Sequence, residues 1–192
     1  MQFRSLKKRV IIDILGVLIL LVALFIWSNK KSDSYIAGNS ISTTYTNISF
    51  DSSDINYILS ISELNVEEIE FGKLIESQTQ QPSLQKLGTN AQLNFAATQL
   101  QLKHLADQAP IEILNEMNST GRDSYEKLLT LRGTDFDTTS LSILRTINKS
   151  IEEISQDEIH ITSNKELKEW AISLLSITKT QLRSINSKQY IL

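Results

Sequence analysis

Three polar residues at mid-helix positions are the part of this sequence best placed to do chemistry. Glu68, Asn148 and Gln181 each lie among apolar residues spaced three or four positions apart, so their side chains project in the same direction as those apolar residues. An isolated ionised carboxylate is costly to bury, and amide groups can donate hydrogen bonds to it. We therefore expect a shared buried polar layer in which Glu68 is protonated, hydrogen-bonded or charge-paired.

A solvent-exposed arrangement of the same residues is the alternative. Glu67 and Glu70 flank Glu68, and a modest rotation of the helix would place all three carboxylates in water. Asn148 likewise has charged neighbours along the chain. In this alternative the polar residues belong to a solvated helix face and form no site.

Groups that commonly carry catalysis are sparse in this chain. It has two histidines: His104 is expected on the surface flank of a helix, and His160 in a link between helices. There is no cysteine, no glycine-rich phosphate loop and no Glu-x-x-His repeat of the kind found in di-iron bundles. We expect no catalytic residue, no bound metal and no cofactor, and the sequence favours a non-enzymatic role.

Helical periodicity predicts the elements that must position the polar layer. Apolar stripes run over residues 54–80, 82–107 and 123–131, then from about 135 and again from 163 to about 185. Gly133 suits the left-handed position after the short helix, and Ser163 to Glu166 has capping-box spacing for the last one. Isolated helices are marginal in water, so the stripes must pack together. We predict an all-α, antiparallel four-helix bundle over residues 51–188.

An apolar run precedes this domain. Residues 10–27 are apolar except for Asp13 and Gly16, and as a helix they would span roughly 27 Å, close to the thickness of a bilayer core. The preceding segment 1–9 is basic, which favours a cytoplasmic N-terminus. The run ends in Trp27 without a small-residue cleavage site, so we expect an uncleaved signal anchor rather than a secretory signal peptide. Residues 28–50, rich in Ser, Thr, Asn and Gly, are expected to form a flexible linker to a domain in the periplasm or outside the cell.

The net charge of the domain indicates which classes of partner it can bind. From Ser32 onward there are 13 Lys and Arg against 21 Asp and Glu, a net charge of −8, and the basic residues are not clustered. Phosphate binding needs a concentrated positive surface, so no nucleic-acid partner is expected. The expected partners are the membrane, through the N-terminal helix, and a protein partner of unknown identity.

Several segments together resemble a bacterial family of exported proteins of unknown function, described as predicted outer-membrane proteins with a ferritin-like bundle. The resemblance covers about residues 54–187. It is carried by the segments 68–74, 102–106 and 128–133, by Phe136-Asp137, by Leu141 and by the segment 174–182. It implies a ferritin-like fold within the bacterial envelope.

The resemblance also implies a place for a metal ion. In the pattern of that family, a glutamate on the first helix is joined by one histidine from each of the other helices, a set that could ligate a transition metal. This chain keeps the glutamate at Glu68, and the histidine positions fall on Phe95, Asn148 and Gln181. Phe95 cannot coordinate a metal, and neutral amides are poor ligands beside imidazole. The resemblance therefore implies a degenerate metal site.

Three hypotheses for function follow. The first is a membrane-anchored, extracytoplasmic bundle with a binding or structural role and a degenerate metal site. The second is a metal-binding redox or metal-storage protein that uses Glu68 with other carboxylates such as Glu67 and Glu70. The third is a partner-docking or envelope-stress module.

Overall fold

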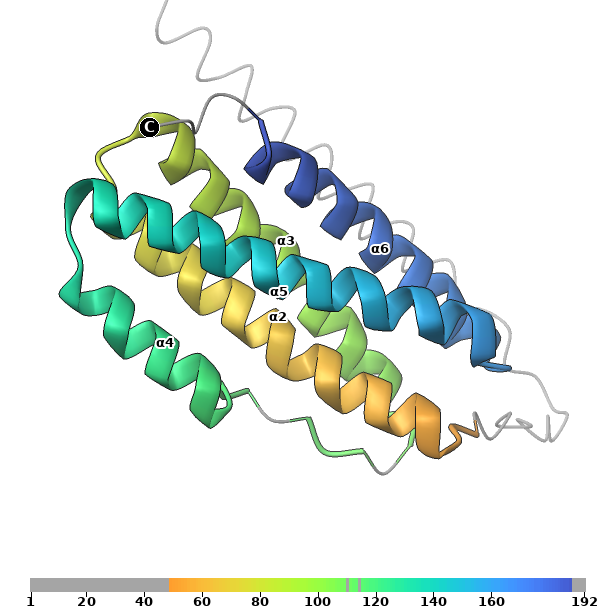
Figure 1. Ribbon diagram of the computed structural model, residues 1–192. Coiled ribbons are helices and arrows are strands. Elements are labelled where there is room, and N and C mark those ends of the chain that lie inside the picture. The colour runs from red at the N-terminus through yellow and green to blue at the C-terminus, as the bar shows by residue number, and fades with distance from the viewer. Residues whose placement is uncertain (1–48, 110, 114, 188–192) are drawn as a thin grey trace, which may run out of the picture. The chain divides into compact units, whose positions relative to one another are not determined.

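The computed structural model describes residues 49–109, 111–113 and 115–187 (Figure 1). These residues form five α-helices and no strand: α2 (Ser52–Gln78), α3 (Pro82–Ala106), α4 (Ser119–Thr130), α5 (Gly133–Ile161) and α6 (Lys165–Ile185). The predicted membrane helix at 10–27, the basic segment 1–9 and nearly all of the predicted linker lie outside the described residues. Of the helices that are described, none has both the length and the apolar character needed to cross a bilayer.

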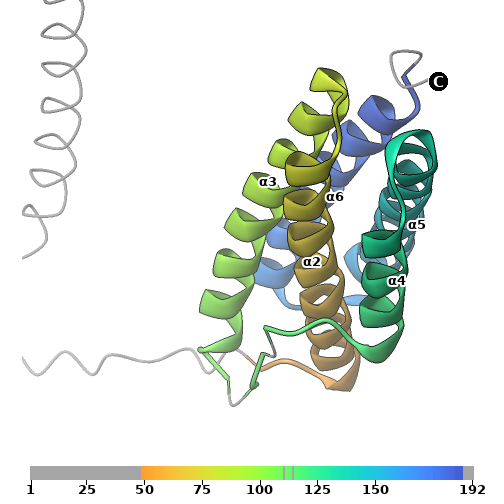
Figure 2. The same ribbon diagram turned by 90° about the vertical axis from the view of Figure 1, so that its left-hand side faces the viewer.

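The four long helices form the predicted helical bundle. α2 packs against α3 and α5, and α6 packs against the same two helices, so the four form a closed ring in which α2 lies diagonally across from α6 (Figures 1 and 2). Helices that share a side of the ring run in opposite directions. The α3–α5 connection is long and contains α4. Because of this crossover, α3 and α5 run in the same direction on diagonal positions.

Local sequence explains where the helices begin. Asp51 forms a capping box at the start of α2, and Pro82 is placed at the start of α3, where its missing N–H costs nothing. The predicted capping box at Ser163 is wrong, because Asn164 is the residue whose side chain accepts the Leu167 N–H. Gly133 has the predicted left-handed conformation, with φ +56°, but it begins α5 directly.

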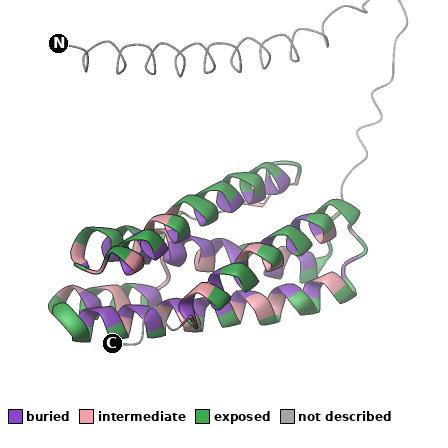
Figure 3. Cartoon of the chain, turned by 90° about the horizontal axis from the view of Figure 1, so that it is seen from above, coloured by how far each residue is buried: buried purple, intermediate pink, exposed green. Residues whose placement is uncertain are grey.

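Apolar side chains from all five helices fill the interior. Figure 3 shows the buried positions on the faces that the helices turn toward one another and the exposed positions on the outer faces. Phe71, Phe95 and Phe136 are among the largest side chains that are fully buried. Burial extends around a wide arc of α2, because α3, α5 and α4 all cover it.

Two glycines bring α2 and α3 close together one helical turn from Glu68. A Cβ atom added at Gly72 would lie 2.7 Å from the carbonyl oxygen of Gly88, and one added at Gly88 would lie 2.7 Å from the carbonyl oxygen of Gly72. Both distances are shorter than any normal contact, so the crossing requires glycine on both helices. This crossing fixes the register of the two helices beside the polar layer.

Candidate functional site

The carboxyl group of Glu68 lies in the interior of the bundle and is fully buried. Its Oε1 accepts a hydrogen bond of 2.6 Å from Asn148 Nδ2 on α5, and its Oε2 accepts one of 2.7 Å from Gln181 Nε2 on α6. Each carboxyl oxygen thus has its own amide donor, supplied by a different helix. The structure therefore brings together the three polar residues that the sequence singled out.

The two amides are held differently. Asn148 Nδ2 also donates to the Leu144 carbonyl, at 2.8 Å, which fixes the orientation of the Asn148 side chain. Asn148 Oδ1 is buried without a hydrogen-bond partner. For Gln181 Nε2, the bond to Glu68 is the one hydrogen bond observed. Gln181 is therefore the amide that can turn and offer its oxygen when Glu68 carries a proton.

Phe95 occupies the fourth side of this layer. The Gly72–Gly88 crossing and the contact between Asn65 and Gln99 fix the α2–α3 register, which places Phe95 level with Glu68. Its side chain is fully buried and apolar. Each long helix thus contributes one residue to the layer: a carboxyl group, two amides and a phenyl ring.

Burial controls the ionisation of Glu68. Removal from water raises the pKa of this carboxyl well above its ordinary value, and the nearby charge of Glu67 raises it further. The hydrogen bond from Gln181 favours the ionised form and opposes the rise. No cationic side chain pairs with Glu68 among the described residues, so desolvation outweighs the hydrogen bonding.

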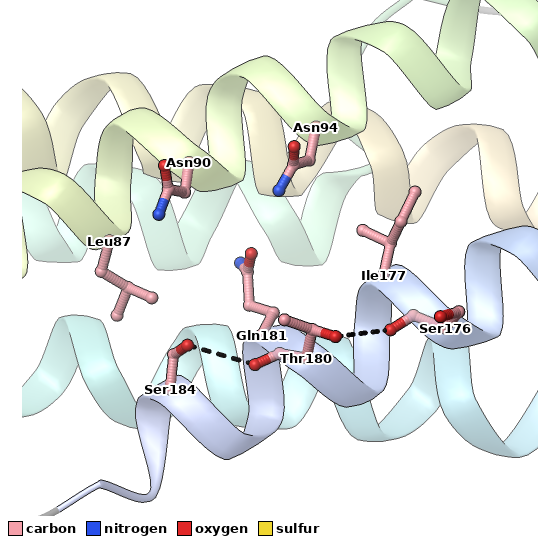
Figure 4. A pocket seen from close by; sticks show the side chains of 8 residues that line it. All are labelled: Leu87, Asn90, Asn94, Ser176, Ile177, Thr180, Gln181 and Ser184. Carbon is pink, nitrogen blue, oxygen red and sulfur yellow. Dashed lines mark hydrogen bonds between the residues drawn. The ribbon is translucent and has the colours of Figure 1, made fainter.

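A polar groove between α3 and α6 leads to this layer (Figure 4). Its volume is about 190 Å³, and Asn90 and Asn94 on α3 face Gln181 on α6 across it. Its lining residues are Leu87, Asn90, Asn94, Ser176, Ile177, Thr180, Gln181 and Ser184. Gln181 therefore connects the buried carboxyl group of Glu68 to a groove that opens to solvent.

The donor set does not fit a transition metal. Both carboxyl oxygens face amide N–H groups, which donate hydrogen bonds and cannot coordinate a cation, and Phe95 has no ligand atom. Within the part of the chain that the structure describes, no three His, Cys, Asp or Glu side chains are grouped so as to hold a metal ion. The arrangement can hold or release a proton at Glu68, and we assign no metal chemistry to it.

The neighbouring carboxylates do not join Glu68. Glu67 turns toward α4, where its Oε1 lies so close to Gly121 that a side chain there would collide with it. Glu70 forms an ion pair of 2.7 Å with Lys73 at the surface. The alternative of a fully solvated cluster is thus wrong for Glu68, which is buried. The hypothesis of a metal-binding redox or storage protein named Glu67 and Glu70 as further ligands, and neither carboxylate joins Glu68 in the layer.

The histidines lie away from the layer. His104 is exposed on α3, as predicted. His160 belongs to the last turn of α5, so the prediction that it lies in a link is wrong. Both histidines lie near the C-terminal ends of their helices, several turns away from the level of Glu68.

Sequence reasoning missed a second polar layer one turn away. Asn65 Nδ2 donates to Gln99 Oε1 at 3.2 Å, and Gln99 Nε2 contacts Ser62 Oγ at 2.8 Å, all in the interior between α2 and α3. A signal for it was present, because Asn65 falls on the same three-and-four spacing as Ile61 and Glu68.

A buried acidic pair at the start of α2 was also missed. Asp54 and Glu158 are both buried and close enough to share a hydrogen bond, and each keeps one oxygen without a partner. Burial and the Asp54 carboxyl raise the pKa of Glu158 to about 7. Tyr57 lies beside this pair and hydrogen-bonds to Ser155 at 3.0 Å. Helical spacing could not predict this pairing, because Asp54 and Glu158 lie far apart in the sequence.

Comparison with known proteins gives one family. The family described as a domain of unknown function (DUF4142) matches residues 43–187, which is well over half of the chain and includes every described helix. No curated protein and no solved structure matches the chain.

Proposed function

The chain belongs to the family described as a domain of unknown function (DUF4142), and we propose that it is a membrane-anchored, extracytoplasmic bundle in which two amides replace the ligands of a metal site. The observation that carries this proposal is the pair of hydrogen bonds, 2.6 and 2.7 Å long, that occupy both carboxyl oxygens of Glu68. In this arrangement the carboxyl group cross-links three helices of the bundle. Its role is binding or structural rather than catalytic.

A ferritin-like topology forms part of the proposal. Ferritin-like bundles have four helices with one long crossover connection, and their metal ligands project into the core from facing helices. The support here is the long α3–α5 connection together with the one buried, inward-facing residue that each long helix contributes to the layer around Glu68. On this view Glu68, Phe95, Asn148 and Gln181 descend from a ligand set.

Placement in the envelope is the next part of the proposal. Its support is the apolar segment 10–27, with the basic segment 1–9 before it, which is the pattern of a helix inserted with its N-terminus in the cytoplasm. The acidic domain that follows contains no cysteine, so its stability does not depend on disulfides in an oxidising compartment. Protease protection in intact cells, with a tag on either terminus, tests this orientation.

Metal analysis tests the proposed degenerate site. The full chain is incubated with Fe²⁺, Mn²⁺ or Zn²⁺, passed through a chelating column and analysed for retained metal. We expect the native protein to retain far less than one ion per chain, because amide N–H groups surround the carboxyl oxygens.

A variant with Phe95→His, Asn148→His and Gln181→His supplies three imidazoles at these positions. We expect it to retain about one ion per chain, since a carboxylate and three imidazoles form a common metal-binding set. The same variant with Glu68→Gln is the matched control and should retain less. Stoichiometric metal in the native protein after chelation would overturn the proposal and favour a metal-binding redox or storage role.

A further inference from the structure

The outward face of α3 carries an apolar stripe that the rest of the described domain leaves uncovered. Leu93 and Leu100 are 60% and 71% exposed, and Ala96 and Ala97 between them are exposed as well. Figure 2 shows α3 at the edge of the bundle, on the side away from α4 and α5. Because these four residues are contiguous on one helix face, they form an exposed apolar patch, and such patches often mark a contact surface.

The sequence of this stripe is symmetric about its centre. The midpoint lies between Ala96 and Ala97, with Leu93 and Leu100 at equal distances on either side, followed by Gln92 and Gln101. An isologous contact uses the same patch on both copies, so residues at equal distances from the two-fold axis must suit one another. A symmetric helix stripe meets this requirement when two copies of α3 cross in opposite directions.

The two ends of α3 carry opposite charges at equal distances from the same midpoint. Lys86 lies on this face before Leu93, and Asp107 lies at the same distance beyond the midpoint; both are exposed. Neither has a salt bridge among the described residues. In an antiparallel pair, Lys86 of each copy faces Asp107 of the other, so both ends of the contact carry opposite charges.

A shallow groove beside Leu100 extends the surface. It has a volume of about 480 Å³ and lies between α3 and α6, with Leu105 and Trp170 among its apolar lining residues. In the antiparallel arrangement, Leu93 of the second copy lies next to Leu100 and can enter this groove. Two alanines at the centre allow the helix backbones to approach closely enough for this insertion.

We propose that the occupant of this stripe is a second copy of the chain, joined through antiparallel packing of α3 on α3 about a two-fold axis between Ala96 and Ala97. From Lys86 to Asp107 the proposed contact, with the apolar stripe at its centre, is about 32 Å long and about 10 Å wide, so it covers roughly 320 Å² on each copy. This is well below the roughly 800 Å² per partner of a standard stable complex. The dimer is therefore weak and reversible, with dissociation in the micromolar range or above.

Disulfide trapping tests the geometry, since the native chain contains no cysteine. Ala97→Cys places a thiol at the two-fold axis, where the two Cα atoms come within the roughly 7 Å that a disulfide requires. The control is Ile161→Cys, which is exposed at the end of α5, away from α3. Under mild oxidation of the full chain in detergent, we expect the Ala97→Cys dimer to form at least roughly ten-fold faster than the control dimer.

Charge exchange tests the antiparallel register. Lys86→Glu and Asp107→Lys each place like charges at both ends of a homodimer, so each variant alone should dimerise roughly ten-fold more weakly than the native chain. Mixing the two variants restores opposite charges at both ends of the heterodimer and should restore the native dissociation constant. Lys127→Glu, at an exposed position on α4, is the control and should leave dimerisation unchanged.

Three results would overturn the proposal. The first is an Ala97→Cys chain that crosslinks no faster than Ile161→Cys. The second is a mixture of the two charge variants that dimerises no better than either variant alone. The third is a thiol at position 97 that is protected in a monomer, because the occupant would then be another segment of the same chain.

Discussion

Replacing Glu68 with glutamine should change how the stability of the domain depends on pH. The folded state raises the pKa of the Glu68 carboxyl well above the ordinary value of 4.5. Above pH 4.5 the unfolded chain therefore releases this proton while the folded chain still holds it. Because the unfolded state then binds fewer protons, the native protein loses stability as the pH rises from 4.5 to the folded-state pKa.

The magnitude follows from proton linkage. One proton held by the folded state and released by the unfolded state changes the free energy of unfolding by about 1.4 kcal/mol for each pH unit in this window. Glu68→Gln keeps the size of the side chain and resembles the protonated acid, once Gln181 turns its amide to accept from the new N–H group. We therefore expect the variant to be close to native in stability near pH 4.5 and increasingly more stable than the native protein above it.

Urea unfolding followed by far-ultraviolet circular dichroism, repeated between pH 4.5 and 8, measures this difference. The pH at which the difference between the two proteins stops growing reports the folded-state pKa of Glu68. Glu76→Gln, on the exposed side of the same helix, is the matched control for the removal of a carboxyl group from α2. A difference between Glu68→Gln and the native protein that does not change with pH would refute the reasoning, since Glu68 would then ionise equally in both states.

Three further substitutions test other parts of the account. Gly72→Ala should destabilise the domain by about 2 kcal/mol or more in urea unfolding, because the new methyl group collides with the Gly88 backbone; a neutral effect would mean that the crossing is looser than observed. Glu158→Gln should flatten the fall in stability between about pH 4.5 and 7, because the folded-state pKa of about 7 delays ionisation beside Asp54; an unchanged pH profile would contradict that pairing. Asp51→Ala should cost about 1 kcal/mol of thermal or urea stability through loss of the capping box, whereas an unaltered melting temperature would show that the cap is dispensable.

The polar layer around Glu68 could be predicted because its signal is local. Ile61, Leu64, Phe71 and Ile75 define a helical face, and Glu68 lies on it, so burial of the carboxyl group follows from helix geometry alone. The same reasoning placed Asn148 and Gln181 inside the bundle. Their convergence on one carboxyl group also depends on the register between three helices. The predicted mid-helix position holds for Glu68 and Asn148, whereas Gln181 lies near the C-terminal end of α6.

The remaining features depend on contacts that spacing does not reveal. α2 is covered by three other helices, so its buried arc is wide and the stripe alone underestimates it; Asn65 lies inside that arc. The pairing of Asp54 with Glu158 joins positions about a hundred residues apart, and two acidic residues are normally expected in water. The direction of α5 depends on the crossover that contains α4, and no local pattern fixes the course of such a connection.

The central claim is that amides rather than a metal ion occupy the oxygens of Glu68, and anomalous X-ray diffraction from native crystals soaked in Mn²⁺ tests it most directly. We expect no anomalous peak at Glu68, with the side-chain amides of Asn148 and Gln181 remaining at hydrogen-bond distance, close to 2.6 and 2.7 Å, from its two oxygens. A strong anomalous peak within about 2.2 Å of the carboxyl group, with both amides turned aside, would contradict the account.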